Sequence, residues 1–213
     1  LREITRSGPW VVYEVAASDL VVPLTVQPVV VGGRTDSQAD MGHPGDAKER
    51  WLEIGTSWLQ NPNDWSAVPA ASGPSEWQRI DVAIDMNRRI GEPDDSSRRV
   101  DVVLPAQPID VVNVEPIVVS EVEQGRSSVS FSVDKIGTPV LVRTSYFPNW
   151  NVSGAEGPYR VAPNMMVVIP TQTEVKLSFG WSLLDVFAYV LSIVGIVVLV
   201  RWRRSGRQTT IAN

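Results

Sequence analysis

The 213-residue chain contains no cysteine and only one histidine, His43. Without cysteine it cannot form a disulfide framework, a zinc ribbon or an iron–sulfur cluster, and it has no thiol nucleophile. A single histidine leaves little room for a histidine-based metal site or proton relay. His43 also lies in a glycine-rich segment without a nucleophile-elbow motif. The sequence therefore predicts no catalytic residue, no metal ligand and no cofactor in this chain.

The average composition excludes several broad classes of protein. The chain is 43% apolar and 20% charged, which is close to ordinary globular usage and excludes wholesale disorder and collagen-like repeats. Its mean hydropathy of −0.02 argues against a chain made mostly of membrane helices. The length allows one domain comfortably and two small domains at most.

The charge is unevenly distributed along the chain. Residues 1–180 carry 15 basic and 23 acidic side chains, a net charge of −8, whereas residues 181–213 carry four arginines and one aspartate, a net charge of +3. Between these two regions lies the apolar run Trp181–Val200, in which Asp185 is the only charge. Twenty helical residues span roughly 30 Å, the thickness of the hydrocarbon core of a bilayer.

The residues that flank this run are typical of a membrane span. Trp181 and Trp202 would lie at opposite lipid–water interfaces, which indole rings favour. Arg201, Arg203 and Arg204 follow the run directly, and the positive-inside rule then places the C-terminus in the cytoplasm. A buried core helix is the alternative, but a continuous apolar run without a polar stripe is rare in that setting.

We therefore expect three parts: an extracytoplasmic domain at residues 1–180, a transmembrane helix at 181–201 and a basic cytoplasmic tail at 202–213. The first ten residues, LREITRSGPW, contain no apolar segment of a signal peptide. We expect the chain to be the C-terminal part of a longer polytopic protein of the cell membrane. A cleaved signal peptide is the alternative explanation.

Alternation of apolar and polar residues predicts that the extracytoplasmic part is mainly β. The alternating patterns include Ile80–Ile84, Val129–Val133 and Val175–Phe179, and runs of β-branched residues occur between Pro9 and Val31. Such patterns are typical of half-buried antiparallel strands. We expect an antiparallel β-sandwich or jelly-roll-like domain.

One short helix is predicted in this domain, at Asp46–Gln60. Asp46 and Glu49 have the spacing of a capping box. Four apolar residues follow at spacings of four, three and four, and so share one helix face: Ala47, Trp51, Ile54 and Trp58. The helix is expected to pack on the sheets through this face.

Six of the eight tryptophans lie in residues 1–180. Exposed indole rings can stack on sugars, but Trp51 and Trp58 share the predicted helix face and are interpreted as core. Trp65 and Trp77 fall in predicted loops and are the candidate glycan-binding residues. Acidic pairs such as Asp81 with Asp85 are interpreted as solvated charge, because no calcium-loop spacing supports a metal site.

The acidic extracytoplasmic part also argues against nucleic acid as a partner, since phosphate binding needs positive patches. The expected partners are the lipid bilayer, a membrane domain upstream in the same chain, and an envelope glycan or glycolipid.

The segment Thr144–Val200 resembles part of a known family. It contains Tyr146-Phe147-Pro148-Asn149-Trp150, followed by Gly157–Arg160, the apolar strand Val167–Pro170 and the alternating strand Val175–Phe179. In this order the motifs resemble the C-terminal end of bacterial YfhO-like and 6-pyruvoyl-tetrahydropterin synthase-related polytopic membrane proteins. The turn after the tryptophan differs, because the family usually has Asp-Gly where this chain has Ser153-Gly154.

The resemblance implies a full-length parent similar to GT-C-type glycosyltransferases, which use a polyprenyl-phosphate sugar in cell-envelope glycan assembly. The catalytic acids of such enzymes lie on early extracytoplasmic loops, so none is carried over to this chain. We expect this part to be non-catalytic and to position an acceptor glycan or pack against the membrane domain. The alternative is a non-enzymatic, membrane-anchored binding or structural ectodomain. A third possibility, an anchored hydrolase, would need a triad or carboxylate pair that the sequence does not reveal.

Overall fold

The computed structural model describes residues 2–14, 18–34, 44–90, 100–181 and 183–206; at 33–34, 44–49, 86, 89–90, 100, 183–186 and 204–206 it describes the backbone only. Within these residues the fold is mainly β with two α-helices, α1 (Pro44–Gln60) and α2 (Leu183–Gly206), and one 3-10 turn, η1 (Pro62–Asp64). The strands in chain order are β1 (Arg2–Ser7), β2 (Trp10–Glu14), β3 (Val21–Pro23), β4 (Val29–Arg34), β5 (Pro69–Ala70), β6 (Arg79–Ile90), β7 (Val100–Pro105), β8 (Val119–Gln124), β9 (Ser128–Val133), β10 (Val140–Val142), β11 (Trp150–Ser153), β12 (Ala155–Val161), β13 (Met165–Pro170) and β14 (Glu174–Phe179).

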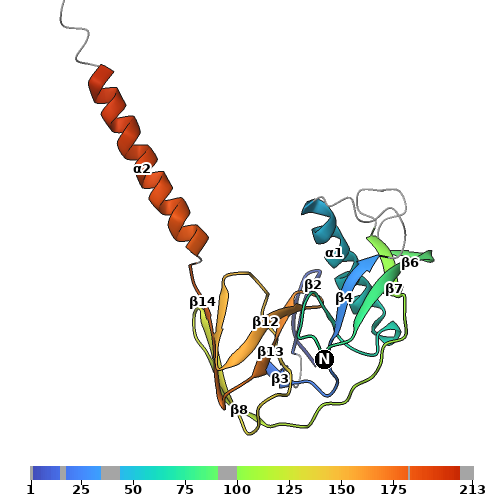
Figure 1. Cartoon of the computed structure of the whole chain (residues 1–213). Helices are drawn as coiled ribbons and strands as arrows, with labels where there is room; N and C mark the ends of the chain where they lie inside the picture. The colour runs from blue at the N-terminus through green and yellow to red at the C-terminus, as the bar shows by residue number, and fades with distance from the viewer. Residues whose placement is uncertain (1, 15–17, 35–43, 91–99, 182, 207–213) are drawn as a thin grey trace, which may run out of the picture.

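The strands form two large sheets and a separate hairpin. The eight-stranded sheet has the order β3-β10-β13-β12-β5-β4-β6-β7, and the four-stranded sheet has the order β11-β14-β9-β8. Strands β1 and β2 pair with each other. In Figure 1, β14 and β8 lie in the part of the domain from which α2 leaves, while β4, β6 and β7 lie beside α1.

The two sheets pack face to face around a hydrophobic core. In β9, Val129, Phe131 and Val133 are buried, whereas the serines between them are partly exposed on the outer face. The core residues opposite come from β10 and β13: Val140, Val142, Met166 and Val168. Full burial of each such side chain contributes about 1.5–3 kcal/mol relative to exposure. The sandwich-like, mainly β architecture predicted from the alternation is confirmed.

Helix α1 covers the half of the eight-stranded sheet that the four-stranded sheet leaves open. Trp51 and Ile54 are buried in a second core with residues of β4 and β6, and Trp58 packs against it. The predicted helix and its apolar face are confirmed at these three positions. The helix begins at Pro44, two residues before the predicted start, and the side chains of its first turns lie outside the description.

A contact between α1 and β12 fixes the helix on the sheet. The Nε1 group of Trp51 donates a hydrogen bond to the carbonyl oxygen of Pro163 at 2.9 Å. The guanidinium group of Arg160 lies 4.8 Å from the centroid of the same ring. Because Arg160 pairs in register with Met166 of the sandwich core, α1 and the four-stranded sheet cover the same face of the larger sheet.

At one of the places where the chain passes from one sheet to the other, the connection is a single glycine. Gly154 lies between β11 of the four-stranded sheet and β12 of the eight-stranded sheet. Its φ is +79°, and a Cβ atom placed on it would lie 2.1 Å from the carbonyl oxygen of Glu174. Only glycine fits this close crossing of backbones.

Two features differ from the predicted antiparallel sandwich. Strand β4 pairs in parallel with both β5 and β6, because α1 carries the chain back to the starting edge, as a parallel pair requires. Strand β1 was not predicted: all its residues are exposed, so no buried face imposes an alternating pattern. The segments at 35–43 and 91–99, which include His43, lie outside the described residues.

Helix α2 leaves the sandwich almost directly from the end of β14, and Figure 1 shows it standing away from the sheets. The backbone N–H of Gly180 donates to the carbonyl oxygen of Asn149 at 3.2 Å, and Nδ2 of Asn149 donates to the carbonyl oxygen of Gly180 at 3.2 Å. These reciprocal bonds hold the start of the helix to the domain. Among the residues whose side chains are described, which in α2 are 187–203, no helix combines the length and the apolarity needed to cross a bilayer.

Candidate functional site

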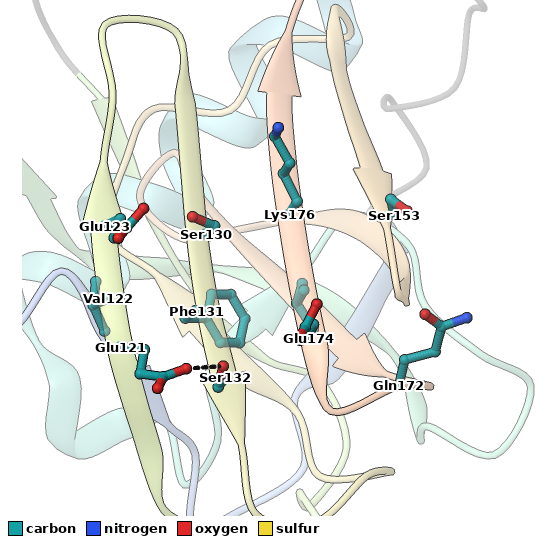
Figure 2. A pocket seen from close by; sticks show the side chains of 11 residues that line it. Glu121, Val122, Glu123, Ser130, Phe131, Ser132, Ser153, Gln172, Glu174 and Lys176 are labelled. Carbon is teal, nitrogen blue, oxygen red and sulfur yellow. Dashed lines mark hydrogen bonds between the residues drawn. The ribbon is translucent and has the colours of Figure 1, made fainter.

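An open groove of about 870 Å³ lies on the outer face of the four-stranded sheet. Figure 2 shows its polar side chains projecting from neighbouring strands toward the viewer. They come from β8, β9, β14, the end of β11 and the turn before β14: Glu121, Glu123, Ser130, Ser132, Ser153, Gln172, Glu174 and Lys176. These residues are largely the outward-facing neighbours of the core residues in the same strands.

A β-bulge brings the carboxylates of β8 onto this face. Ser120 pairs with Ser132 and Glu123 pairs with Ser130, so two residues of β8 lie opposite one residue of β9. Glu121, the first bulge residue, has a φ of +52°, a conformation that L residues rarely adopt outside functional or turn positions. Its carboxylate accepts a hydrogen bond from the Ser132 hydroxyl at 2.8 Å, as Figure 2 shows.

The groove combines three carboxylates with one ammonium group. The carboxylates of Glu121, Glu123 and Glu174 are exposed to water. No group of three or more residues suited to holding a metal occurs in the described part of the chain. The arrangement therefore offers hydrogen-bond acceptors and hydroxyl groups to a polar ligand on an open surface.

Trp65, one of the two predicted glycan-binding residues, lies in the core beneath α1. It is 6% exposed and packs with the core residues around Trp51 and Ile54. Its Nε1 group is buried and meets no hydrogen-bond partner within the described residues. In this fold neither face of the ring is open to a sugar.

Trp77, the other predicted glycan-binding residue, is also buried, at 2% exposure. Its ring packs edge-to-face on Tyr159 with a centroid distance of 5.4 Å. Its own loop covers it: a Cβ atom on Gly73 would lie 2.1 Å from the ring. Stacking of a sugar on either tryptophan would require the local core to open.

The residues predicted to lie at membrane interfaces flank or end α2. Trp181 and Trp202 are exposed, as are Arg201 and Arg203. The ring of Trp181 contacts Tyr189 of the first turns of α2 at a centroid distance of 4.7 Å. The side chain of Arg204 lies outside the description. The helix continues to Gly206, five residues beyond the predicted end of the span.

Comparisons of the chain with protein-family models, with curated proteins and with solved structures give no match. The resemblance of Thr144–Val200 to YfhO-like proteins therefore stays a prediction, and the function must be argued from the residues and the fold.

The groove was not predicted, although the alternation in one of its strands, β9, is visible in the sequence. The alternation of Val129, Phe131 and Val133 predicted a buried face, and the same alternation places the intervening serines on one outer face. What the sequence could not reveal was the pairing of β8 with β9 and the bulge at Glu121. Strand neighbours and bulges depend on contacts distant in sequence.

Proposed function

We propose that this chain is the membrane-anchored extracytoplasmic domain of an envelope protein and that it has a binding or structural role. Helix α2 is the observation that carries the proposal. It has 24 residues, about 36 Å at 1.5 Å per residue. From Phe187 to Val200 its large apolar side chains are exposed. No other described element covers this apolar surface, which is unfavourable in water and favourable in lipid.

The surroundings of α2 support the same proposal. Trp181 and Trp202 stand near its two ends, and Arg201 and Arg203 are the exposed cations of its last turns. This is the order of interface aromatic, apolar run and cytoplasmic cations that orients membrane helices. The acidic sandwich then lies on the extracytoplasmic side and the C-terminus on the cytoplasmic side.

Alkaline extraction of membranes from cells that express the chain tests the anchor. We expect the full chain to stay in the membrane pellet, because a spanning helix is held by the whole hydrocarbon core. Release into the supernatant would contradict the proposal.

The orientation is tested with single cysteines, since the chain has none of its own. Thr173→Cys, in the turn before β14, should react with a membrane-impermeant maleimide in intact cells. Ser205→Cys, near the end of α2, should react only after permeabilisation. Equal reaction of both sites in intact cells would rule out the span.

We propose further that the groove on the four-stranded sheet binds an envelope glycan. Its serines, glutamates and Gln172 offer the hydroxyl, carboxylate and amide groups that hydrogen-bond sugar hydroxyls, over a space of about 870 Å³. Glu121→Gln and Glu174→Gln should each weaken binding of neutral oligosaccharides about tenfold, the usual effect of losing a charged acceptor. Titration calorimetry on the detergent-solubilised chain measures this, with Glu156→Gln on β12 as the matched control. Equal affinities in all variants would exclude the groove.

A membrane glycosyltransferase of envelope glycan assembly is our proposal for the parent protein, with this chain as a non-catalytic part. The order of motifs in Thr144–Val200 supports it. Sequencing the coding region upstream of Leu1 tests it: multiple membrane spans with an acidic loop after the first would favour the transferase, and a signal peptide alone would favour a self-contained anchored ectodomain.

A further inference from the structure

One end of the four-stranded sheet lies at the start of α2. Strand β14 ends at Phe179, and its neighbours bring the β8–β9 turn and the start of β11 to the same level. The N–H of Phe179 donates to the carbonyl oxygen of Ser127 at 2.8 Å, which fixes the turn beside the helix junction. The α2 end of the domain is defined here as the turn 125–127, the segment 147–150 and residues 179–181.

Aromatic rings are concentrated at the α2 end. Phe179 packs edge-to-face on Phe147 with a centroid distance of 6.2 Å and on Trp150 with one of 5.4 Å. Phe147 is nevertheless 53% exposed, Phe179 43% and Trp181 68%. The sandwich core therefore does not need their outer faces, which continue the apolar surface of α2 onto the domain.

One cationic side chain, that of Arg126, lines a small cleft beside these rings. The cleft has a volume of about 150 Å³, and its lining includes Arg126, Ser127, Ser128, Thr144, Trp150 and Phe179. Arg126 is exposed, and the described residues provide it with no ion-pair partner. The other residues of the lining supply serine and threonine hydroxyls and no carboxylate. The cleft is therefore locally positive within an acidic domain.

We propose that the α2 end of the domain binds the headgroups of anionic phospholipids in the outer leaflet. This inference rests on the proposed membrane anchor, which holds the α2 end at the bilayer surface. Phe147, Phe179 and Trp181 lie at the boundary of headgroups and acyl chains, where aromatic rings are favoured. The guanidinium group of Arg126 pairs with a lipid phosphate in the adjacent cleft, as arginine does with phosphate at other sites.

The test uses the full chain in lipid nanodiscs, with a fluorophore on Pro148→Cys as the only thiol; Pro148 is exposed at the α2 end and does not line the cleft. The discs contain a fixed fraction of phosphatidylcholine with a nitroxide on the headgroup, which quenches fluorophores near the bilayer surface. We expect strong quenching at residue 148 and little at a fluorophore on Thr173→Cys, at the opposite end of β14. Replacing unlabelled phosphatidylcholine by phosphatidylglycerol should reduce the quenching at residue 148, because the anionic lipid displaces the nitroxide lipid from the cleft.

Arg126→Gln should lower this preference for phosphatidylglycerol about fivefold, the effect expected for one arginine near an anionic surface. Lys135→Gln, which removes one positive charge beyond the far end of β9, should leave the preference unchanged. Equal quenching at residues 148 and 173, or an equal effect of the two charge variants, would overturn the inference. Alkaline extraction of the same variants keeps the two proposals separate, because release from the membrane would refute the anchor itself.

Discussion

Two buried tryptophans of one core differ in the partner of the indole N–H. Trp51 and Trp65 are both 6% exposed and belong to the same core. The Nε1 group of Trp51 donates to Pro163, whereas that of Trp65 is buried without a partner in the described structure. A buried donor without an acceptor loses its hydrogen bond to water and gains nothing in return.

The same substitution at both sites therefore has different effects. Trp51→Phe and Trp65→Phe remove similar volumes, but only the first breaks a hydrogen bond and weakens a cation–π contact, that with Arg160. We expect Trp51→Phe to lower the free energy of unfolding by about 1–2 kcal/mol more than Trp65→Phe. Urea titration in detergent, followed by tryptophan fluorescence, measures the difference. Equal losses would show that Trp65 has an acceptor after all.

At the scale of single residues, the sequence predicts burial better within helices than within loops. Trp51 and Trp58 share a periodic helix face, and their packing follows from their spacing. Trp65 and Trp77 stand outside any period, and their burial depends on where η1 and the loop of Gly73 fold back over the sheet. No local pattern encodes that path.

At the scale of elements, an arginine links β6 to the turn that follows α1. Nε of Arg88 pairs with the Asp85 carboxylate at 2.5 Å, and Nη2 of Arg88 pairs with the carboxylate of Asp64 in η1 at 3.0 Å. The hydrogen bond from Arg88, with a second from the N–H of Asn87, lowers the pKa of the Asp85 carboxyl below its ordinary value. Protonation of Asp85 therefore weakens the link.

The stability of the domain should depend on Asp85 in a pH-dependent way. Because its pKa is lower when folded than when unfolded, its contribution is present above the unfolded value of about 3.9 and is lost as the pH falls through the folded value. Asp85→Asn should destabilise the chain at about pH 7, and the difference from the native chain should vanish at acidic pH. Urea midpoints across this range measure it, with Asp110→Asn as the unpaired control. A difference that persists in acid would contradict the role of the ion pair.

Alternation of apolar and polar residues predicts some strands of this fold and not others. It predicts β9 and β14 because each has one buried and one exposed face. It does not predict β1, whose residues are all exposed, nor the parallel pairing of β4 with β6, which follows from the crossover through α1. An alternation with period two indicates that one face of a strand is buried. It does not indicate the direction of the strand, which depends on the connections between strands.

At the scale of the whole molecule, the sandwich and α2 share no hydrophobic core. None of the three core clusters in the described residues includes a residue of α2. The junction bonds between Gly180 and Asn149 lie entirely within residues 1–180. Within the described residues, the hydrophobic packing of the domain therefore does not involve the helix.

We expect residues 1–180, expressed alone, to fold with the same urea midpoint as the full chain in detergent. The truncated chain should also stay in solution without detergent, since the exposed apolar surface of α2 is removed. Near-ultraviolet circular dichroism and sedimentation measure both properties. Aggregation or a lost near-ultraviolet signal would show that the helix contributes to the fold.

Because β14 leads almost directly into α2, the strand also sets how far its residues lie above the membrane. With Phe179 at the headgroup level and the strand along the bilayer normal, each residue before it stands about 3.3 Å higher. Lys176 then lies roughly 10 Å above the surface and Glu174 roughly 17 Å. A bare lipid headgroup ends below both residues, whereas a lipid-linked chain of several sugars passes alongside them. The groove would thus select its ligand by height above the membrane before any hydrogen bond is formed.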